Sequence, residues 1–191
     1  MGRRNFDVGL LPPGKKAVTK SELKTPASVR RERWPTPRMR RPRVFQKAGI
    51  AVSWIRCKSS NLDPEPDLRC QDPASAARLN LRIVPRARKS SDGIFGVAFL
   101  SAEGTGAYST VFYDSVERLE RDWHVGLTRV LGHVMAHELG HLLLGSNAHS
   151  RQGIMCPKWH GDELRLASTG ALLFSEEQAQ FMRERLVNLP D

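Results

Sequence analysis

Four short segments of the chain carry the hydrophobic patterns of β-strands. Residues 50–57 (IAVSWIRC) and 79–84 (LNLRIV) alternate apolar and polar side chains, the period of a strand with one buried face. Residues 94–100 (IFGVAFL) form a nearly continuous apolar run, and residues 108–113 (YSTVFY) are β-branched and aromatic. A glycine-bearing turn at residues 102–106 separates the last two segments. The pattern predicts four strands.

Three other segments have the signals of helices. Residues 44–49 (VFQKAG) predict the end of a helix that a glycine terminates. From residue 127 to residue 145, apolar side chains recur at spacings of three and four up to a final glycine, which predicts a long and largely buried helix. Near the C-terminus, Ser175 with Gln178 three residues later forms a capping box ahead of an apolar stripe. We therefore expect a short amphipathic helix to end the domain.

The charge of the chain is divided unevenly along its length. The 191 residues suit one domain, and their formal net charge is +10. Residues 1–47 carry 14 Lys and Arg against 3 acidic residues, whereas residues 48–191 carry 16 against 17. Half of the 12 prolines also lie before residue 43, in a composition that does not offset the entropy cost of ordering. We predict a disordered, basic, Pro-rich segment at residues 1–43 and a folded domain at residues 44–191.

The basic segment has two interpretations. It is either a solvated tail or an arm for nucleic acid or an anionic surface, which Arg38, Arg40, Arg41 and Arg43 with the interleaved Trp34 would serve. Because the predicted folded domain is nearly neutral, nucleic acid is not the partner we expect for it.

The sequence contains few signals of cellular location. The apolar stretch at residues 8–11 is interrupted by Pro12 and Pro13, so the sequence predicts no export signal. A secreted or periplasmic location would follow if the start of the sequence is misassigned. Cys57 and Cys70 flank a polar loop, and they either form a disulfide in an oxidising compartment or stay reduced. No apolar run approaches the roughly 18 residues of a membrane span.

The candidate chemistry lies in the predicted long helix, as the motif HELGH. Residues four apart share one helical face, so His137 and His141 can reach a single ion. Glu138 is rotated by about 100° from His137 and is free to act as the general base on an activated water. Catalytic zinc usually has three protein ligands, and His149 follows shortly after the end of the helix. His149 is therefore the candidate third ligand.

The motif HELGH, followed by a glycine and a further histidine, resembles the metzincin clan of zinc peptidases, whose pattern is HExxHxxGxxH. In HELGHLLLGSNAH the glycine falls one residue late and the last histidine two residues late, so the turn must differ from that of the family. The resemblance implies that His137, His141 and His149 bind one zinc ion. His160 and Glu163 remain alternatives for the third ligand, the latter by its similarity to the downstream glutamate of thermolysin-like enzymes.

Other segments extend the resemblance. Met155, within the sequence GIMCP, looks like the methionine of the Met-turn, which forms a hydrophobic base beneath the metal; the alternative is ordinary core filling. The segment at residues 93–100 resembles the edge strand of the matrixin subgroup, and the C-terminal helix resembles its closing helix. This likeness implies that Val97, Ala98 and Phe99 pair with an extended substrate.

The resemblance implies an α+β, zincin-like domain with a small twisted mixed sheet, an active-site helix that carries HExxH, and a C-terminal helix. It implies a zinc-dependent metallopeptidase with one catalytic zinc ion, Glu138 as the general base, and a protein or peptide as substrate. We expect no membrane span and a monomer. Metzincin domains usually begin with a strand and then a helix, and here only the end of that helix is visible.

Two other functions are compatible with the motif. One is a non-catalytic zinc-binding or nucleic-acid-associated protein that uses the basic arm, with a structural zinc closed by four protein ligands, although the only cysteine near the helix is Cys156. The other is an inactive relative that serves as an interaction module, against which the intact Glu138 argues. His133 lies one turn before His137, and it either lines the cleft or packs in the core.

Overall fold

The strands in the described part of the chain form one mixed sheet. The computed structural model describes residues 4–11, 43–57, 78–85 and 93–188. The strands in these residues are β1 (Arg4–Leu11), β2 (Ala51–Cys57), β3 (Arg78–Val84), β4 (Gly96–Phe99) and β5 (Tyr108–Phe112). They lie in the order β2-β1-β3-β5-β4. β3 and β5 are parallel, and the other neighbouring pairs are antiparallel. The α+β class with a small mixed sheet is thus confirmed, as are the four predicted strands.

Strand β1 corrects the assignment of the N-terminal segment. β1 pairs with β2 on one side and with β3 on the other, so it is an interior strand of the sheet. The prediction of disorder is therefore wrong for residues 4–11, and the folded domain does not begin at residue 44. The strand pattern is present in the alternating sequence NFDVGL, but the surrounding positive charge and prolines dominated the composition. Residues 12–42, with Arg38, Arg40 and Arg41, lie outside the described residues.

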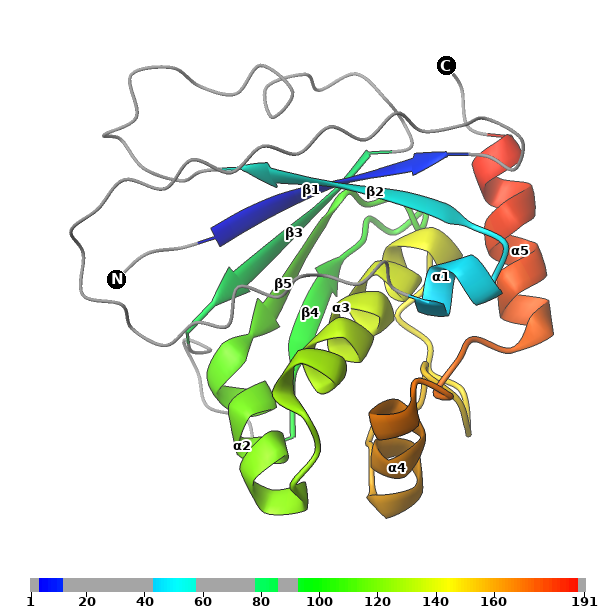
Figure 1. Cartoon of the computed structure of the whole chain (residues 1–191). Coiled ribbons are helices and arrows are strands. Elements are labelled where there is room, and N and C mark those ends of the chain that lie inside the picture. The colour runs from blue at the N-terminus through cyan, green and yellow to red at the C-terminus, as the bar shows by residue number, and fades with distance from the viewer. Residues whose placement is uncertain (1–3, 12–42, 58–77, 86–92, 189–191) are drawn as a thin grey trace, which may run out of the picture.

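The helices lie on one side of the sheet (Figure 1). They are α1 (Arg43–Lys47), α2 (Tyr113–Trp123), α3 (Leu127–Leu144), α4 (Gly161–Thr169) and α5 (Glu176–Val187). The predicted helices at the positions of α1, α3 and α5 are confirmed, including the reciprocal capping box between Ser175 and Gln178. The sequence analysis missed α2 and α4. α2 buries Val116 and Leu119 at a three-residue spacing, which is a short apolar stripe. Seven of its eleven residues are polar or charged, so this stripe was too short to predict a helix.

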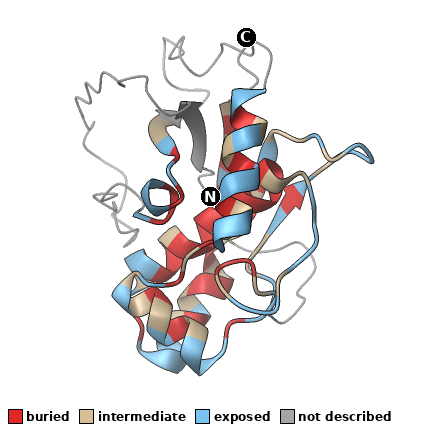
Figure 2. Ribbon diagram, turned by 90° about the vertical axis from the view of Figure 1, so that its right-hand side faces the viewer, coloured by how far each residue is buried: buried red, intermediate tan, exposed pale blue. Residues whose placement is uncertain are grey.

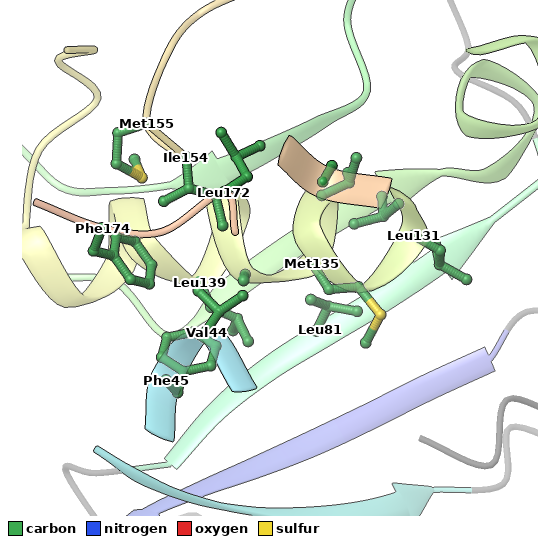
Figure 3. Packing of buried hydrophobic residues seen from close by; sticks show 14 of the residues in the cluster. Val44, Phe45, Leu81, Leu131, Met135, Leu139, Ile154, Met155, Leu172 and Phe174 are labelled. Carbon is green, nitrogen blue, oxygen red and sulfur yellow. The ribbon is translucent and has the colours of Figure 1, made fainter. Parts of the chain in front are cut away.

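Helix α3 is the centre of the fold. It contacts α1, α2, α4 and α5 as well as strands β3, β4 and β5. Twelve of its eighteen residues are buried, and buried positions concentrate along the central helix in Figure 2. Figure 3 shows Ile154 and Leu172 on one side of α3 and Val44 and Leu81 on the other. Burial of each large apolar side chain stabilises the folded state by roughly 1.5–3 kcal/mol. Because such contacts lie on both sides of α3, they fix the position of the helix that carries the site.

No described helix has the length and apolar content needed to cross a lipid bilayer. Cys57 ends β2, and Cys70 lies outside the described residues, so the two alternatives for this pair stay open. Among the described residues, Cys156 is a free thiol.

Candidate metal centre

The C-terminal end of α3 brings the motif HELGH to the surface of the core. The helix ends at Leu144, and Gly145 takes the left-handed conformation with φ 64°. Its backbone N–H donates to the carbonyl oxygen of His141, and Ser146 N–H donates to the same oxygen. A residue with a side chain is strained at this φ, so the glycine allows the helix to stop one turn after His141.

Backbone carbonyls fix the orientation of both helical histidines. His137 Nδ1 lies 2.7 Å from the carbonyl oxygen of Ile154, and His141 Nδ1 lies 2.8 Å from that of Ser146. A carbonyl oxygen only accepts, so each Nδ1 must carry the proton. In the neutral rings each Nε2 atom then carries a lone pair and no proton. The two Nε2 atoms are 3.1 Å apart. Two lone pairs at this distance repel each other unless a cation or a proton lies between them.

Burial disfavours the protonated, charged form of the three histidines. It lowers the pKa of His137 to about 4, chiefly by desolvation of the charged ring, and the pKa values of His141 and His149 are lowered for the same main reason. Near neutral pH the rings are therefore neutral, which is the form that binds metals. This arrangement of lone pairs could hold a cation.

The third histidine comes from the turn after α3. The Ser146 hydroxyl accepts from Ala148 N–H at 3.0 Å, and this bond closes a tight turn that brings His149 back over the helix end. The His149 ring centroid lies 5.4 Å from that of His137 and 4.9 Å from that of His141. The ligand atoms of the three residues all lie within 4.8 Å of one another. His137, His141 and His149 can therefore hold one metal ion.

Glu138 lies beside this cluster and is almost completely buried, with 4% of its surface exposed. No described residue donates a hydrogen bond to its carboxylate, and the lack of solvation raises its pKa to about 8. The carboxylate packs against strand β4 at Gly96, where an added Cβ would lie 2.6 Å from Glu138 Cδ and Oε1. Only glycine leaves room for the carboxylate at this point. A glycine inside a strand signals such a close approach, but the sequence analysis did not use it.

Met155 lies under the helix rather than in the cleft. It is fully buried, and its Sδ would be 2.7 Å from a Cβ added at Gly140, the residue before His141. Figure 3 shows Met155 and Phe174 at the same end of α3. The loop returns there because Ile154 N–H donates to the Leu173 carbonyl. Met155 thus supports the helix backbone between the two histidines, which is compatible with either reading of its role.

A cleft of about 270 Å³ runs between the three histidines and the edge of the sheet. Glu138 and Asn147 line it together with residues 93–98, so of the predicted substrate-binding positions Val97 and Ala98 border the cleft. Phe99 is 55% exposed and is not among the residues that line it. Side chains alternate between the two faces of β4, and Ala98 is buried while its neighbours Val97 and Phe99 are exposed.

Trp159 is a cleft residue that the sequence analysis missed. Its side chain is buried. The centroid of its ring lies 6.0 Å from the ring centroid of His137 and 6.1 Å from that of Phe95. It follows Cys156 and Pro157, which also line the cleft, but no spacing rule tied this tryptophan to the helix.

The alternative ligands have other roles. Glu163 accepts from the His160 backbone N–H at 3.1 Å, and the two residues form the capping box of α4. Neither belongs to the histidine group found among the described residues. His133 is buried, its Nδ1–H donates to the Arg129 carbonyl at 2.8 Å, and it is not a lining residue of the cleft. Of its two interpretations, packing is the one these contacts favour.

No protein-family profile, curated protein or solved structure matches this chain. Its function therefore has to be argued from the geometry of the site.

Proposed function

We propose that this chain is a zinc-dependent metallopeptidase of the metzincin type. One observation carries the proposal: ligand atoms of three imidazoles lie within 4.8 Å of one another, and the buried carboxylate of Glu138 lies beside them in a cleft. The strand-then-helix opening of metzincin domains also has a counterpart here, because β1 precedes α1. Zincin-like identity is part of this proposal.

Zinc fits the two donors of the helix well. Two ligands at tetrahedral angles and at Zn–N distances of 2.0–2.1 Å would be about 3.3 Å apart. His137 Nε2 and His141 Nε2 are 3.1 Å apart before any adjustment. The hydrogen bonds to the Ile154 and Ser146 carbonyls are of the kind that orient histidine ligands in metal sites. A zinc ion held there would polarise a scissile carbonyl and lower the pKa of water.

The surrounding residues supply the remaining chemistry. β4 is an outer strand of the sheet that the described residues form, so its edge can pair with an extended peptide through backbone hydrogen bonds. That pairing would hold the scissile bond along Val97 and Ala98, opposite the histidines. Glu138 would take the proton from the attacking water and pass it to the leaving amine. Phe95 and Trp159, whose ring centroids are 6.1 Å apart, give this part of the cleft apolar walls.

A structural zinc site fits the arrangement less well. Such a site is closed by four protein ligands, whereas the group found in the described part of the chain has three and borders an open cleft. Cys156 lines the same cleft, but its thiol faces the Lys158 carbonyl oxygen at 3.2 Å. The open position favours catalysis over a purely structural role.

The first test is metal content. The purified protein should contain one zinc per chain by elemental analysis, and His137→Ala or His141→Ala should lose it, because two lone pairs cannot hold the ion in competition with water and chelators. His124→Asn is the matched control, since His124 is exposed at the end of α2 and asparagine tolerates its left-handed backbone. Full occupancy in both helix variants would refute the metal site.

The second test separates the candidates for the third ligand. His149→Ala should weaken zinc affinity by at least a hundredfold in a competition titration, because it removes one of three imidazoles. His160→Ala and Glu163→Ala should stay within a few-fold of the parent, since these residues cap α4. An unchanged zinc affinity in His149→Ala, together with a large loss in Glu163→Ala, would replace the metzincin reading with a thermolysin-like one.

A further inference from the structure

A second open cavity adjoins the metal cleft. It measures about 350 Å³ and shares Gly93, Phe95 and Trp159 with the cleft. One face of α2 forms its opposite wall through Ser115, Arg118, Leu119 and Asp122, and Lys158 and His160 complete it. The Phe95 and Trp159 rings therefore form a partition between two neighbouring depressions. Nothing in the proposed chemistry uses the second one.

The floor and the rim of this cavity differ in character. Phe95, Leu119 and Trp159 give the cavity an apolar floor beside the buried Ser115, and the exposed Arg118, Asp122, Lys158 and His160 form its rim. The rim holds both signs of charge, because Arg118 and Lys158 are exposed there together with Asp122. Exposed ion pairs contribute far less to binding than the removal of a large apolar side chain from water. The apolar floor, not the rim charge, should therefore decide what the cavity takes.

The position of the cavity relative to the histidines limits which substrate residue reaches it. The His137 and Trp159 ring centroids are 6.0 Å apart, and the cavity begins on the far side of Trp159. An extended chain advances about 3.3 Å per residue, so about two residues span the 6.0 Å to Trp159, and the cavity beyond that ring lies two or three residues along the chain. A peptide paired with β4 continues past Gly93 and Phe95, which line both depressions.

On the premise that the cleft hydrolyses peptides, we propose that the second cavity is a specificity subsite for a large apolar side chain, two or three residues from the scissile bond. The subsite distinguishes substrates through α2, which contributes no lining residue to the metal cleft. Leucine, methionine and phenylalanine are the side chains that the apolar floor fits.

The test uses the full-length, zinc-loaded protein and a mixture of unstructured peptides, with the cleavage sites mapped by mass spectrometry. The wild type should favour a large apolar residue at one position two or three residues from the cut. Two peptides that differ only there, leucine against alanine, should differ at least tenfold in kcat/KM. Ser115→Phe, which fills the cavity, should bring that ratio to within about twofold of one and leave cleavage of the alanine peptide unchanged.

Two further variants make the outcome decisive. Asp122→Phe narrows the mouth from the exposed rim, so it covers the case in which the buried Ser115→Phe does not fold. Glu120→Phe adds the same side chain to α2 outside the cavity and should keep the wild-type ratio. An unchanged ratio in both cavity variants, or no apolar preference in the wild type, overturns the subsite and leaves the peptidase intact. A complete lack of chelator-sensitive cleavage overturns the peptidase itself, and the subsite with it.

Discussion

Glu138→Gln should keep one zinc per chain and lower kcat by about two to four orders of magnitude, the range attributed to general base catalysis. Glutamine has the size of glutamate, so it still fits against Gly96, where the carboxylate has no room to spare. The amide cannot accept the proton of the attacking water. Because Glu138 is not one of the three converging ligands, the metal site should be unaffected. Elemental analysis and the rate of peptide cleavage measure the two effects separately.

Glu177→Gln is the matched control for this variant, because Glu177 is exposed in the first turn of α5. It should retain both zinc and wild-type turnover. Turnover that persists in Glu138→Gln would exclude Glu138 as the base. Loss of zinc together with activity would instead mean that the carboxylate belongs to the ligand set.

The part of the site that could be predicted from the sequence depends on local geometry. The two histidines and Glu138 lie on one regular helix, and helix periodicity alone sets their relative directions. His149 is reached by a short turn after a glycine C-cap, so little freedom separates it from the helix. For these four residues, sequence distance is a good guide to spatial distance.

The residues that could not be predicted come from elsewhere in the chain. Gly96 meets Glu138 because β4 crosses the helix, and Trp159 reaches His137 from the loop before α4. Both contacts depend on how the sheet and the loops pack, which no periodicity encodes. Strand β1 was missed for a different reason: its short alternating pattern was outweighed by the basic, proline-rich residues around it.

Deletion of residues 1–11 should unfold the domain. β1 forms seven residue pairs with β2 and six with β3, so its removal takes away both ladders and detaches β2 from the rest of the sheet. Backbone hydrogen bonds contribute about 0.5–1.5 kcal/mol each, and their loss here is comparable with the 5–15 kcal/mol that stabilises a whole domain. We expect no cooperative thermal transition by circular dichroism and no bound zinc. Deletion of residues 1–3 alone is the control and should leave both unchanged.

A single substitution tests the same strand without shortening the chain. Val8 pairs with Trp54 on one side and with Leu79 on the other, so its backbone lies within the interior of the sheet. Proline at this position removes the N–H, and prolines are confined to edge strands, strand starts and bulges for that reason. Val8→Pro should therefore lower the free energy of unfolding by at least the 1–3 kcal/mol of an unsatisfied buried group. Val8→Ile, which keeps the N–H and favours strands, should unfold at the parental temperature. If Val8→Pro and the truncated chain both unfold at that same temperature with zinc bound, β1 is not part of the stable sheet, and the domain begins at α1.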